Sequence, residues 1–326
     1  MDAHPTIVVT GAAGFIGRAC LAHLAARGFT VRGLVRALDA HTAGRAEFLP
    51  VGDLATTDAR LLQHALRGAH AVVHLAARAH RMRDDAADPE AEYRRENVDV
   101  ARRVLQAAAE AGVPHLVLAS TVKVNGEATS RGHPFREDDP PHPHDAYAKS
   151  KWMAEQATAE IAEAAGVRAT ALRLPLTYGP GVHANLDALA RAVRRGIPLP
   201  FGGVANRRSL LGLGNFCDAL AVLLASDGRA ERGRLTRYFV ADAAPASTPE
   251  IVRAMADAMR VPARLVALPP PWLRLGAMCV GHANRAQRLM DSLEVDTSAF
   301  RTRFGWTPPL SLAQGMAAAF GNRAPL

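Results

Sequence analysis

The sequence predicts an α/β protein built on a doubly wound parallel sheet, followed by a smaller and less regular second unit. Two observations support this fold class. Short uninterrupted apolar runs, such as residues 6–9 and 116–118, suit strands that are buried on both faces of a parallel sheet. Helical apolar patterns stand between such runs, and this alternation is typical of an α/β fold. The 326 residues are enough for one large domain with a smaller companion.

The first expected strand leads into a glycine-rich turn in TIVVTGAAGFIG, residues 6–17. Gly11 permits a tight turn, Gly14 lets a pyrophosphate approach the backbone, and Gly17 lets the following helix lie close to the strand. Unpaired N–H groups at the start of that helix face the phosphates. Apolar residues at helical spacing follow, and Gly28 ends the helix. The turn therefore predicts dinucleotide binding.

The motif TGAAGFIG resembles the opening of the extended short-chain dehydrogenase/reductase family. The resemblance covers almost the whole chain and implies a Rossmann-type domain that binds NAD or NADP. VGDL at residues 51–54 supports it, because the family's aspartate hydrogen-bonds the adenine amino group; a turn or cap aspartate is the alternative. Small residues in VVHLAA, residues 72–77, let the cofactor lie against the backbone. The residues expected at the cofactor are Gly11, Gly14, Phe15, Ile16, Gly17, Arg36, Asp53, Leu54, Ala76, Ala77, Asn97, Ser120, Tyr147, Lys151, Pro175 and Leu176.

The stretch that ends the fifth expected strand carries the chemistry. Thr121 stands at the carboxyl end of that strand, which faces the ligand in doubly wound folds. After a proline-rich loop, Asp145 is a candidate N-cap, and Tyr147 and Lys151 stand four residues apart on one face of a helix. Thr121, Tyr147 and Lys151 match the catalytic residues of the family in their order.

A phenol has a free pKa of about 10 and is a poor base at neutral pH. We expect the ammonium of Lys151 and a cationic nicotinamide to favour the phenolate of Tyr147, which then exchanges a proton with a sugar hydroxyl or carbonyl. Thr121 is expected to hold the same oxygen, and Lys151 to grip the cofactor ribose. Asn97 matches the helix asparagine of the family, and a surface polar residue is the alternative.

The end of the second strand, VRGLVR at residues 31–36, bears on the choice between NAD and NADP. An NAD-selective relative ends this strand with an acid that accepts from both adenosine ribose hydroxyls. Val35 stands at that place and Arg36 follows, so the acid is missing and a guanidinium is available for a 2′-phosphate. Asp39 in the next loop is close enough in sequence to leave NAD as an alternative. The sequence therefore favours NADP(H) over NAD(H).

A less regular half follows the sixth expected strand. We expect residues 1–178 to form the NAD(P)-binding domain and residues 179–326 the substrate domain, with a strand near residues 237–242 returning to the first domain. HLAARAH, KVNGE and NRRSL resemble the nucleotide-sugar branch of the family, which implies a UDP-sugar as the substrate. The expected substrate contacts are Arg78, Lys123, Asn185, Phe201, Arg208 and Arg288.

Within that branch the chain resembles UDP-4-keto-6-deoxy-N-acetylglucosamine 4-reductases and UDP-glucose 4-epimerases. We favour NAD(P)H-dependent reduction of the C4 keto group of a UDP-linked 4-keto-6-deoxy amino sugar, a precursor of surface polysaccharides. A UDP-sugar 4-epimerase with tightly bound NAD is the alternative, because the same trio serves both reactions. A non-enzymatic NADP-sensing regulator is a minor alternative, because such proteins tend to lose the Tyr and Lys, whereas this chain keeps Tyr147 and Lys151. TVKVN lacks the acid pair of a dehydratase, and Asn125 stands where epimerases of the family usually have tyrosine.

Composition limits the remaining functions. The net charge of +8 comes from scattered arginines without interleaved aromatic residues, which argues against nucleic acid as a partner. Cys20, Cys217 and Cys279 are far apart and odd in number, which argues against a disulfide framework and a CxxC metal site and favours a reducing compartment. Without a secretory start or a long apolar run, we expect a cytoplasmic protein with no metal site and no membrane insertion. The family resemblance also implies a homodimer.

Overall fold

The computed structural model describes residues 4–38, 46–78, 88–182, 185–226, 231–269, 273, 287 and 289–321. Within them the chain forms a seven-stranded sheet in the order β3-β2-β1-β4-β5-β6-β9, in which every neighbouring pair is parallel. The strand order reverses between β1 and β4, which is where doubly wound sheets bind ligands. This confirms the expected fold class. The strands are β1 (Thr6–Thr10), β2 (Thr30–Val35), β3 (Glu47–Pro50), β4 (Ala71–His74), β5 (His115–Thr121), β6 (Arg168–Leu174) and β9 (Arg234–Phe239).

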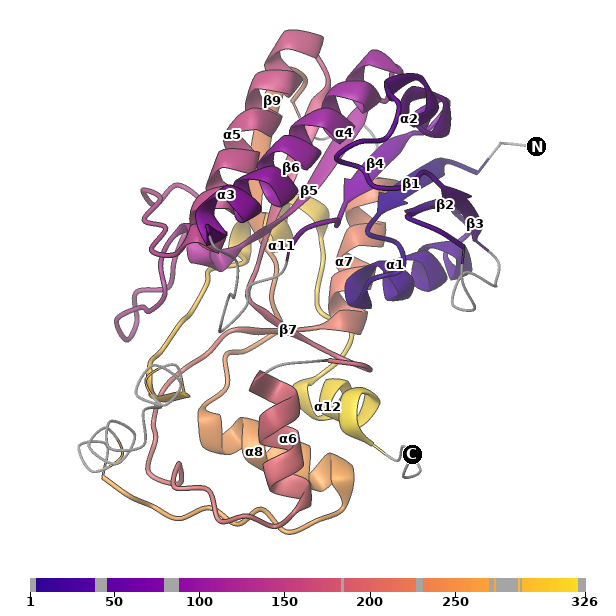
Figure 1. The fold of residues 1–326 in the computed structure, drawn as a ribbon. Coiled ribbons are helices and arrows are strands. Elements are labelled where there is room, and N and C mark those ends of the chain that lie inside the picture. Colours follow the sequence, from indigo (N-terminus) through magenta and orange to yellow (C-terminus); the bar gives the residue numbers. More distant parts are fainter. Residues whose placement is uncertain are drawn as a thin grey trace.

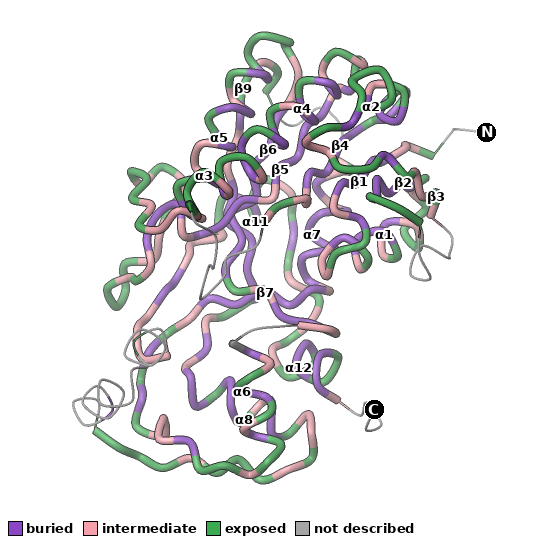
Figure 2. Tube along the Cα trace, viewed as in Figure 1, coloured by how far each residue is buried: buried purple, intermediate pink, exposed green. Residues whose placement is uncertain are grey.

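Helices cover both faces of the sheet (Figure 1). One face packs against α1 (Phe15–Ala26), α7 (Leu213–Ala225) and α11 (Ser298–Phe304). The other packs against α2 (Ala59–Leu66), α4 (Val100–Glu110) and α5 (Ala146–Ala165). Burial therefore runs along the strands and the inner sides of the helices (Figure 2), which explains the uninterrupted apolar strand runs. Among the helices of the described ranges, none combines the length and apolar character needed to cross a bilayer.

The second half is smaller and packs around its own core (Figure 1). A two-stranded parallel sheet, β7 (Leu176–Tyr178) and β8 (Leu210–Gly212), lies with α6 (Asn185–Arg194), α8 (Thr248–Met259) and α12 (Leu312–Phe320). Between β8 and α8 the chain returns to the large sheet as β9, beside β6; the sequence places this strand near residues 237–242. The division of the chain at residue 178 stays a prediction.

Two cysteines distant in the sequence lie together in the structure. Cys20 on α1 and Cys217 on α7 are buried, and their Sγ atoms are 3.6 Å apart. Both are free thiols. Burial, with the neighbouring Cys217, raises the pKa of Cys20 well above its usual value, so this thiol stays protonated and packs the contact between the two helices. Cys279 lies outside the described residues.

A buried carboxylate holds α5 to the sheet. Glu155 on α5 is 0% exposed and accepts hydrogen bonds from three strands. Ser120 Oγ of β5 donates to Oε1 at 2.5 Å, and Arg237 Nε of β9 donates to Oε2 at 2.8 Å. Arg173 of β6 donates twice, from Nε to Oε1 at 3.0 Å and from Nη2 to Oε2 at 2.8 Å. Burial opposes ionisation, but these donors outweigh it and lower the pKa of Glu155 below its usual value.

The remaining nitrogen of Arg173 gives Asn125 a structural role. Arg173 Nη1 donates to Asn125 Oδ1 at 3.0 Å. Asn125 Nδ2 in turn donates to the carbonyl oxygens of Arg136 and Asp139, both at 3.4 Å. Asn125 is 4% exposed, so its short amide joins the buried guanidinium to the backbone of the loop between β5 and α5. The asparagine that departs from the family pattern therefore fastens this loop to the sheet.

Arg173→Met should destabilise the fold strongly. The substitution keeps much of the side-chain bulk but leaves Glu155 as a buried carboxylate with half its donors gone. We expect the free energy of unfolding to fall by about 3–5 kcal/mol, measured by urea denaturation followed by circular dichroism. The matched control is Arg234→Met on β9, whose side chain is 74% exposed and whose loss should cost less than about 1 kcal/mol. Equal losses in the two variants would contradict this role of the buried pair.

Candidate active site

The glycine turn between β1 and α1 forms a close-packed cradle. Gly11 has a φ of +65°, and a Cβ there would lie 2.7 Å from the backbone nitrogen of Ala76. A Cβ on Gly17 would lie 2.2 Å from the carbonyl oxygen of Gly11, so α1 meets the turn only because no side chain intervenes. Gly14 is the N-cap of α1, no side chain of the described residues caps that helix, and its first turn holds no acid. The helix N-terminus, where Phe15 and Ile16 are half-buried, therefore suits a pyrophosphate.

The end of β4 lies against this turn. The Ala76 N–H donates to Thr10 Oγ1 at 3.3 Å, and His74 Nδ1 lies 2.9 Å from the same hydroxyl. Burial, and then the charge of Lys151, lowers the pKa of His74 to about 3, so its ring is neutral. His74 is absent from the residues expected from sequence, although a lone histidine inside the run VVHLAA was an available signal. The small Ala76 and Ala77 follow it at the carboxyl edge of the sheet.

Asn97 is buried and hydrogen-bonds two separate segments of the chain. It lies in a π-helical turn, Arg94–Asp99, between α3 (Pro89–Tyr93) and α4, and is 2% exposed. Asn97 Oδ1 accepts from the Arg78 N–H at 2.7 Å, and Nδ2 donates to the Arg78 carbonyl at 3.2 Å and to Ser150 Oγ at 3.0 Å. The alternative of a surface polar residue is therefore wrong. Asn97 holds the segment after β4 against the helix that carries Lys151.

The three expected catalytic residues meet at the carboxyl end of β5. Thr121 ends that strand, and a hydrogen bond joins its hydroxyl to the Tyr147 phenol in the first turn of α5. Burial raises the pKa of Tyr147 to about 12; the Thr121 hydrogen bond lowers it, whereas the charge of Asp145 raises it further. In the free protein the cost of burying the charged form outweighs the hydrogen bond, so the phenol is protonated. The expected effect of a cationic nicotinamide, together with Lys151, on the phenolate stays a prediction.

Lys151 is hydrogen-bonded to β5, the strand beside α5. Its Nζ donates to the carbonyl oxygen of Ala119 at 3.0 Å, and its side chain is buried. Burial lowers the pKa of Lys151 to about 8, and the Glu155 carboxylate acts against that lowering. The group is therefore a charged ammonium through neutral pH and loses its proton as the pH rises through about 8.

Lys123 forms an ion pair with Asp145, the N-cap residue of α5. Its Nζ donates to Asp145 Oδ2 at 2.7 Å and to Glu127 Oε1 at 3.0 Å. Asp145 Oδ1 accepts from the Ala148 N–H at 2.7 Å, which confirms the expected N-cap. The ammonium of Lys123 therefore offsets the carboxylate that stands two residues before Tyr147. A substrate contact for Lys123 stays a prediction.

The other residues expected at the dinucleotide differ in exposure. Arg36 is exposed directly after β2, and Asp39 lies outside the described residues. Asp53 is exposed and its Oδ1 accepts from the Ala55 N–H at 3.0 Å, as a turn aspartate does, while Leu54 is half-buried beside it. The Ser120 hydroxyl is committed to Glu155. Pro175 is buried and Leu176 is 43% exposed, where the chain leaves β6 for β7.

The expected substrate contacts are spread over both halves. In the first half, Arg78 Nη1 lies 3.6 Å from Glu92 Oε2, and its guanidinium stands 5.5 Å from the Tyr93 ring centre. In the second half, Phe201 is half-buried, and Arg208 Nη1 donates to the carbonyl of Asp291 at 2.9 Å. Their roles toward a substrate stay predictions. Asn185 begins α6 without a described side chain, and Arg288 lies outside the described residues.

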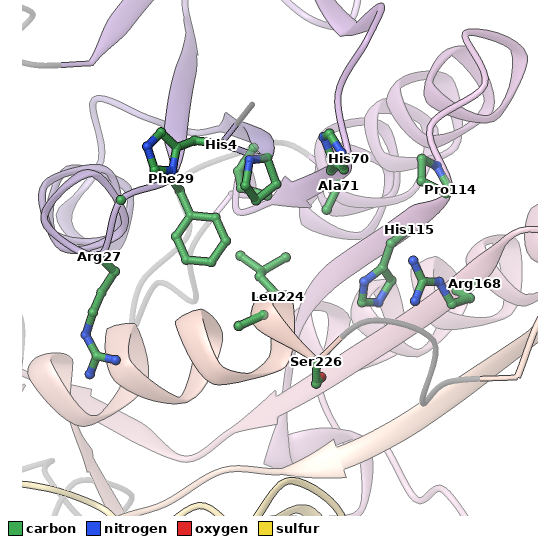
Figure 3. A pocket seen from close by; sticks show the side chains of 14 residues that line it. His4, Arg27, Phe29, His70, Ala71, Pro114, His115, Arg168, Leu224 and Ser226 are labelled. Carbon is green, nitrogen blue, oxygen red and sulfur yellow. The ribbon is translucent and has the colours of Figure 1, made fainter. Parts of the chain in front are cut away.

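A cavity of about 390 Å³ lies at the opposite, amino-terminal edge of the sheet (Figure 3). Its lining includes the guanidinium groups of Arg27 and Arg168 and the imidazole rings of His70 and His115. Arg27 is the C-cap of α1, and α7 ends in the same wall. Because helix C-termini carry partial negative charge, cations there stabilise the fold. Because the cavity lies at the amino-terminal edge of the sheet and Thr121 lies at the carboxyl edge, the cavity is apart from the candidate active site.

Known proteins resemble the chain along nearly its whole length. The model of the NAD dependent epimerase/dehydratase family matches residues 7–236. The UDP-glucose 4-epimerase of Vibrio cholerae is 34% identical over 315 residues, which cover 95% of this chain and 93% of the relative. The 2-alkyl-3-oxoalkanoate reductase of Stenotrophomonas maltophilia (strain K279a) is 28% identical over 336 residues, covering 95% and 97%. The solved structure of MoeE5 in complex with UDP-glucuronic acid and NAD has a TM-score of 0.74 at 25% identity and covers 97% of both chains.

Gly17→Ala should abolish dinucleotide binding. The added methyl collides with the Gly11 carbonyl, so the turn and α1 must separate and the N–H groups lose their arrangement. Titration with NADH, followed by its fluorescence, should show affinity lowered more than about 100-fold. Gly112→Ala is the control, because that glycine also strains an alanine with its φ of +78° but has open space around it. Equal affinity in the two variants would show that the turn is not the binding site.

Proposed function

Because the chain belongs to the NAD-dependent epimerase/dehydratase family, we propose that it is a UDP-sugar 4-epimerase that works with bound NAD. The observation that carries the proposal is the meeting of Thr121, Tyr147 and Lys151 at the same edge of the sheet as the glycine turn. The UDP-glucose 4-epimerase of Vibrio cholerae, similar over almost its whole length, favours the epimerase over the reductase that the sequence alone favours.

The residues at this edge fit a dinucleotide. The N-terminus of α1, which no side chain of the described residues caps, suits the pyrophosphate, and the small Ala76 and Ala77 leave the backbone after β4 accessible. Lys151 gives one of its three N–H groups to Ala119, and the others suit ribose hydroxyls. When bound, the cofactor supplies hydride removal and return at C4 of the sugar.

Tyr147 exchanges the proton of the C4 oxygen. With a pKa of about 12 the phenol is protonated at neutral pH in the free protein, which suits proton donation to a keto oxygen. The opposite half of an epimerisation needs the phenolate, which the Thr121 hydrogen bond favours and a nearby positive charge also favours. An epimerase uses both directions in each turnover, whereas a reductase uses only the donation.

A 4-ketoreductase that consumes NADPH is the second candidate, and the end of β2 favours it. Val35 is buried where NAD-selective relatives carry an acid, and Arg36 is exposed beside it. The relative from Stenotrophomonas maltophilia is named as a reductase. Against NADP stands MoeE5, which was solved with NAD. The favoured reductase substrate is the UDP-linked 4-keto-6-deoxy amino sugar expected from sequence.

One assay distinguishes the two candidates. The purified protein is denatured to release any bound cofactor, which is identified by mass spectrometry. The intact protein is then given UDP-galactose without added cofactor and, separately, UDP-4-keto-6-deoxy-N-acetylglucosamine with NADPH or NADH. We expect released NAD and conversion of UDP-galactose to UDP-glucose. Oxidation of NADPH by the keto sugar, with no conversion of UDP-galactose, would replace the epimerase by the reductase.

Tyr147→Phe should lower kcat by about 1,000-fold or more, because the ring stays and only the proton-carrying oxygen is lost. NADH affinity, measured by fluorescence, should stay within about threefold of the unmodified protein. Tyr238→Phe is the control, a buried tyrosine of β9 whose ring packs against Phe300 and Phe304 of α11. Retained turnover in Tyr147→Phe would assign the proton transfer to another group.

A further inference from the structure

Three residues of α5 stand four positions apart and share the face that lies on the sheet. They are Tyr147, Lys151 and Glu155, and the last two are 4% and 0% exposed. Tyr147 and Lys151 belong to the proposed reaction. Glu155 lies one helical turn farther along, at about 6 Å along the helix axis from Lys151.

Lys151 and Glu155 reach two consecutive residues of β5. Lys151 Nζ donates to the Ala119 carbonyl at 3.0 Å, and Ser120 Oγ donates to Glu155 Oε1 at 2.5 Å. One turn of helix joins the two side chains, and one peptide bond joins the two strand residues. The contacts of Glu155 and of the ammonium therefore lie on neighbouring residues of the same strand.

Among the described residues, Glu155 is the negative charge that acts on Lys151. Burial lowers the pKa of Lys151 to about 8, and Glu155 opposes that lowering. His74 of β4 is neutral, with a pKa of about 3, and Tyr147 is protonated, with a pKa of about 12. Behind Glu155, the guanidinium groups of Arg173 and Arg237 neutralise part of its charge.

We propose that Glu155 is a positioning residue for Lys151: anchored by β5, β6 and β9, it fixes the ammonium against β5 and supplies the charge that faces it. This inference rests on the proposed role of Lys151 at the cofactor ribose. The buried network then acts on the reaction through Lys151 and without contact with the substrate.

The chain offers a direct readout, because its only lysines are Lys123, Lys149 and Lys151. Protein labelled with [13Cε]lysine gives three NMR signals, which Lys123→Arg and Lys149→Arg assign by elimination. A pH titration then yields the midpoint of Lys151. Binding of NADH, followed by fluorescence below and above that midpoint, reports on the same ammonium without any sugar turnover.

The Lys151 midpoint should shift in opposite directions when the Glu155 carboxylate is removed and when a cation that pairs with it is removed. Glu155→Gln removes the facing charge and should lower the Lys151 midpoint by about one pH unit, with NADH binding weakened about fivefold at the original midpoint. Arg237→Gln removes a cation that neutralises Glu155 and should raise the midpoint. Glu163→Gln, an exposed glutamate in the last turn of α5, should leave both measurements unchanged.

An unshifted Lys151 midpoint in folded Glu155→Gln, or shifts of the same sign in both variants, overturns the inference. Should Glu155→Gln fail to fold, Arg237→Gln decides alone, because its side chain is 27% exposed and Arg173 still pairs with Glu155. A raised midpoint then supports the inference and an unchanged one overturns it. If the variants show these shifts but the unmodified protein converts no UDP-sugar, only the proposed function is contradicted.

Discussion

The structure depends on how a helix that carries polar groups is held at the edge of an apolar sheet. A buried carboxylate is stable as an anion only where fixed donors replace its water. Glu155 obtains them from β5, β6 and β9, which are neighbours in the sheet. The placement of α5 and the strand order therefore depend on each other. Because β9 enters the sheet only after the chain has crossed into the second half, the donors around Glu155 are complete only when that return has been made.

The same network links the two halves of the chain. Asn125 fastens the loop between β5 and α5 to the buried guanidinium of β6. That loop pairs with a late segment through Phe135 and Val295, and the same segment pairs with the second half through Leu293 and Arg208. A segment near the end of the chain thus lies between the loop that leads into α5 and the half expected to hold the substrate.

Burial dominates the electrostatics of the candidate site. It raises the pKa of Tyr147, lowers that of Lys151, and lowers that of His74 until the ring is neutral. Each shift disfavours the charged form, as expected where water is excluded. The protein thus holds a protonated phenol, an ammonium of lowered pKa and a neutral imidazole at one edge of the sheet. Hydrogen bonds and neighbouring charges then shift the pKa of these groups by smaller amounts.

Local sequence determined the fold class, the glycine turn and the order of Thr121, Tyr147 and Lys151, because strand runs, turn glycines and four-residue helix spacing act over a few neighbouring positions. The tertiary structure alone decided that Asn97 is buried and that Asn125 reaches Arg173 from 48 positions away. It also decided the protonation of Tyr147, Lys151 and His74, because that depends on burial by distant elements. Contacts between positions so far apart leave no local pattern, so only the packed chain specifies them.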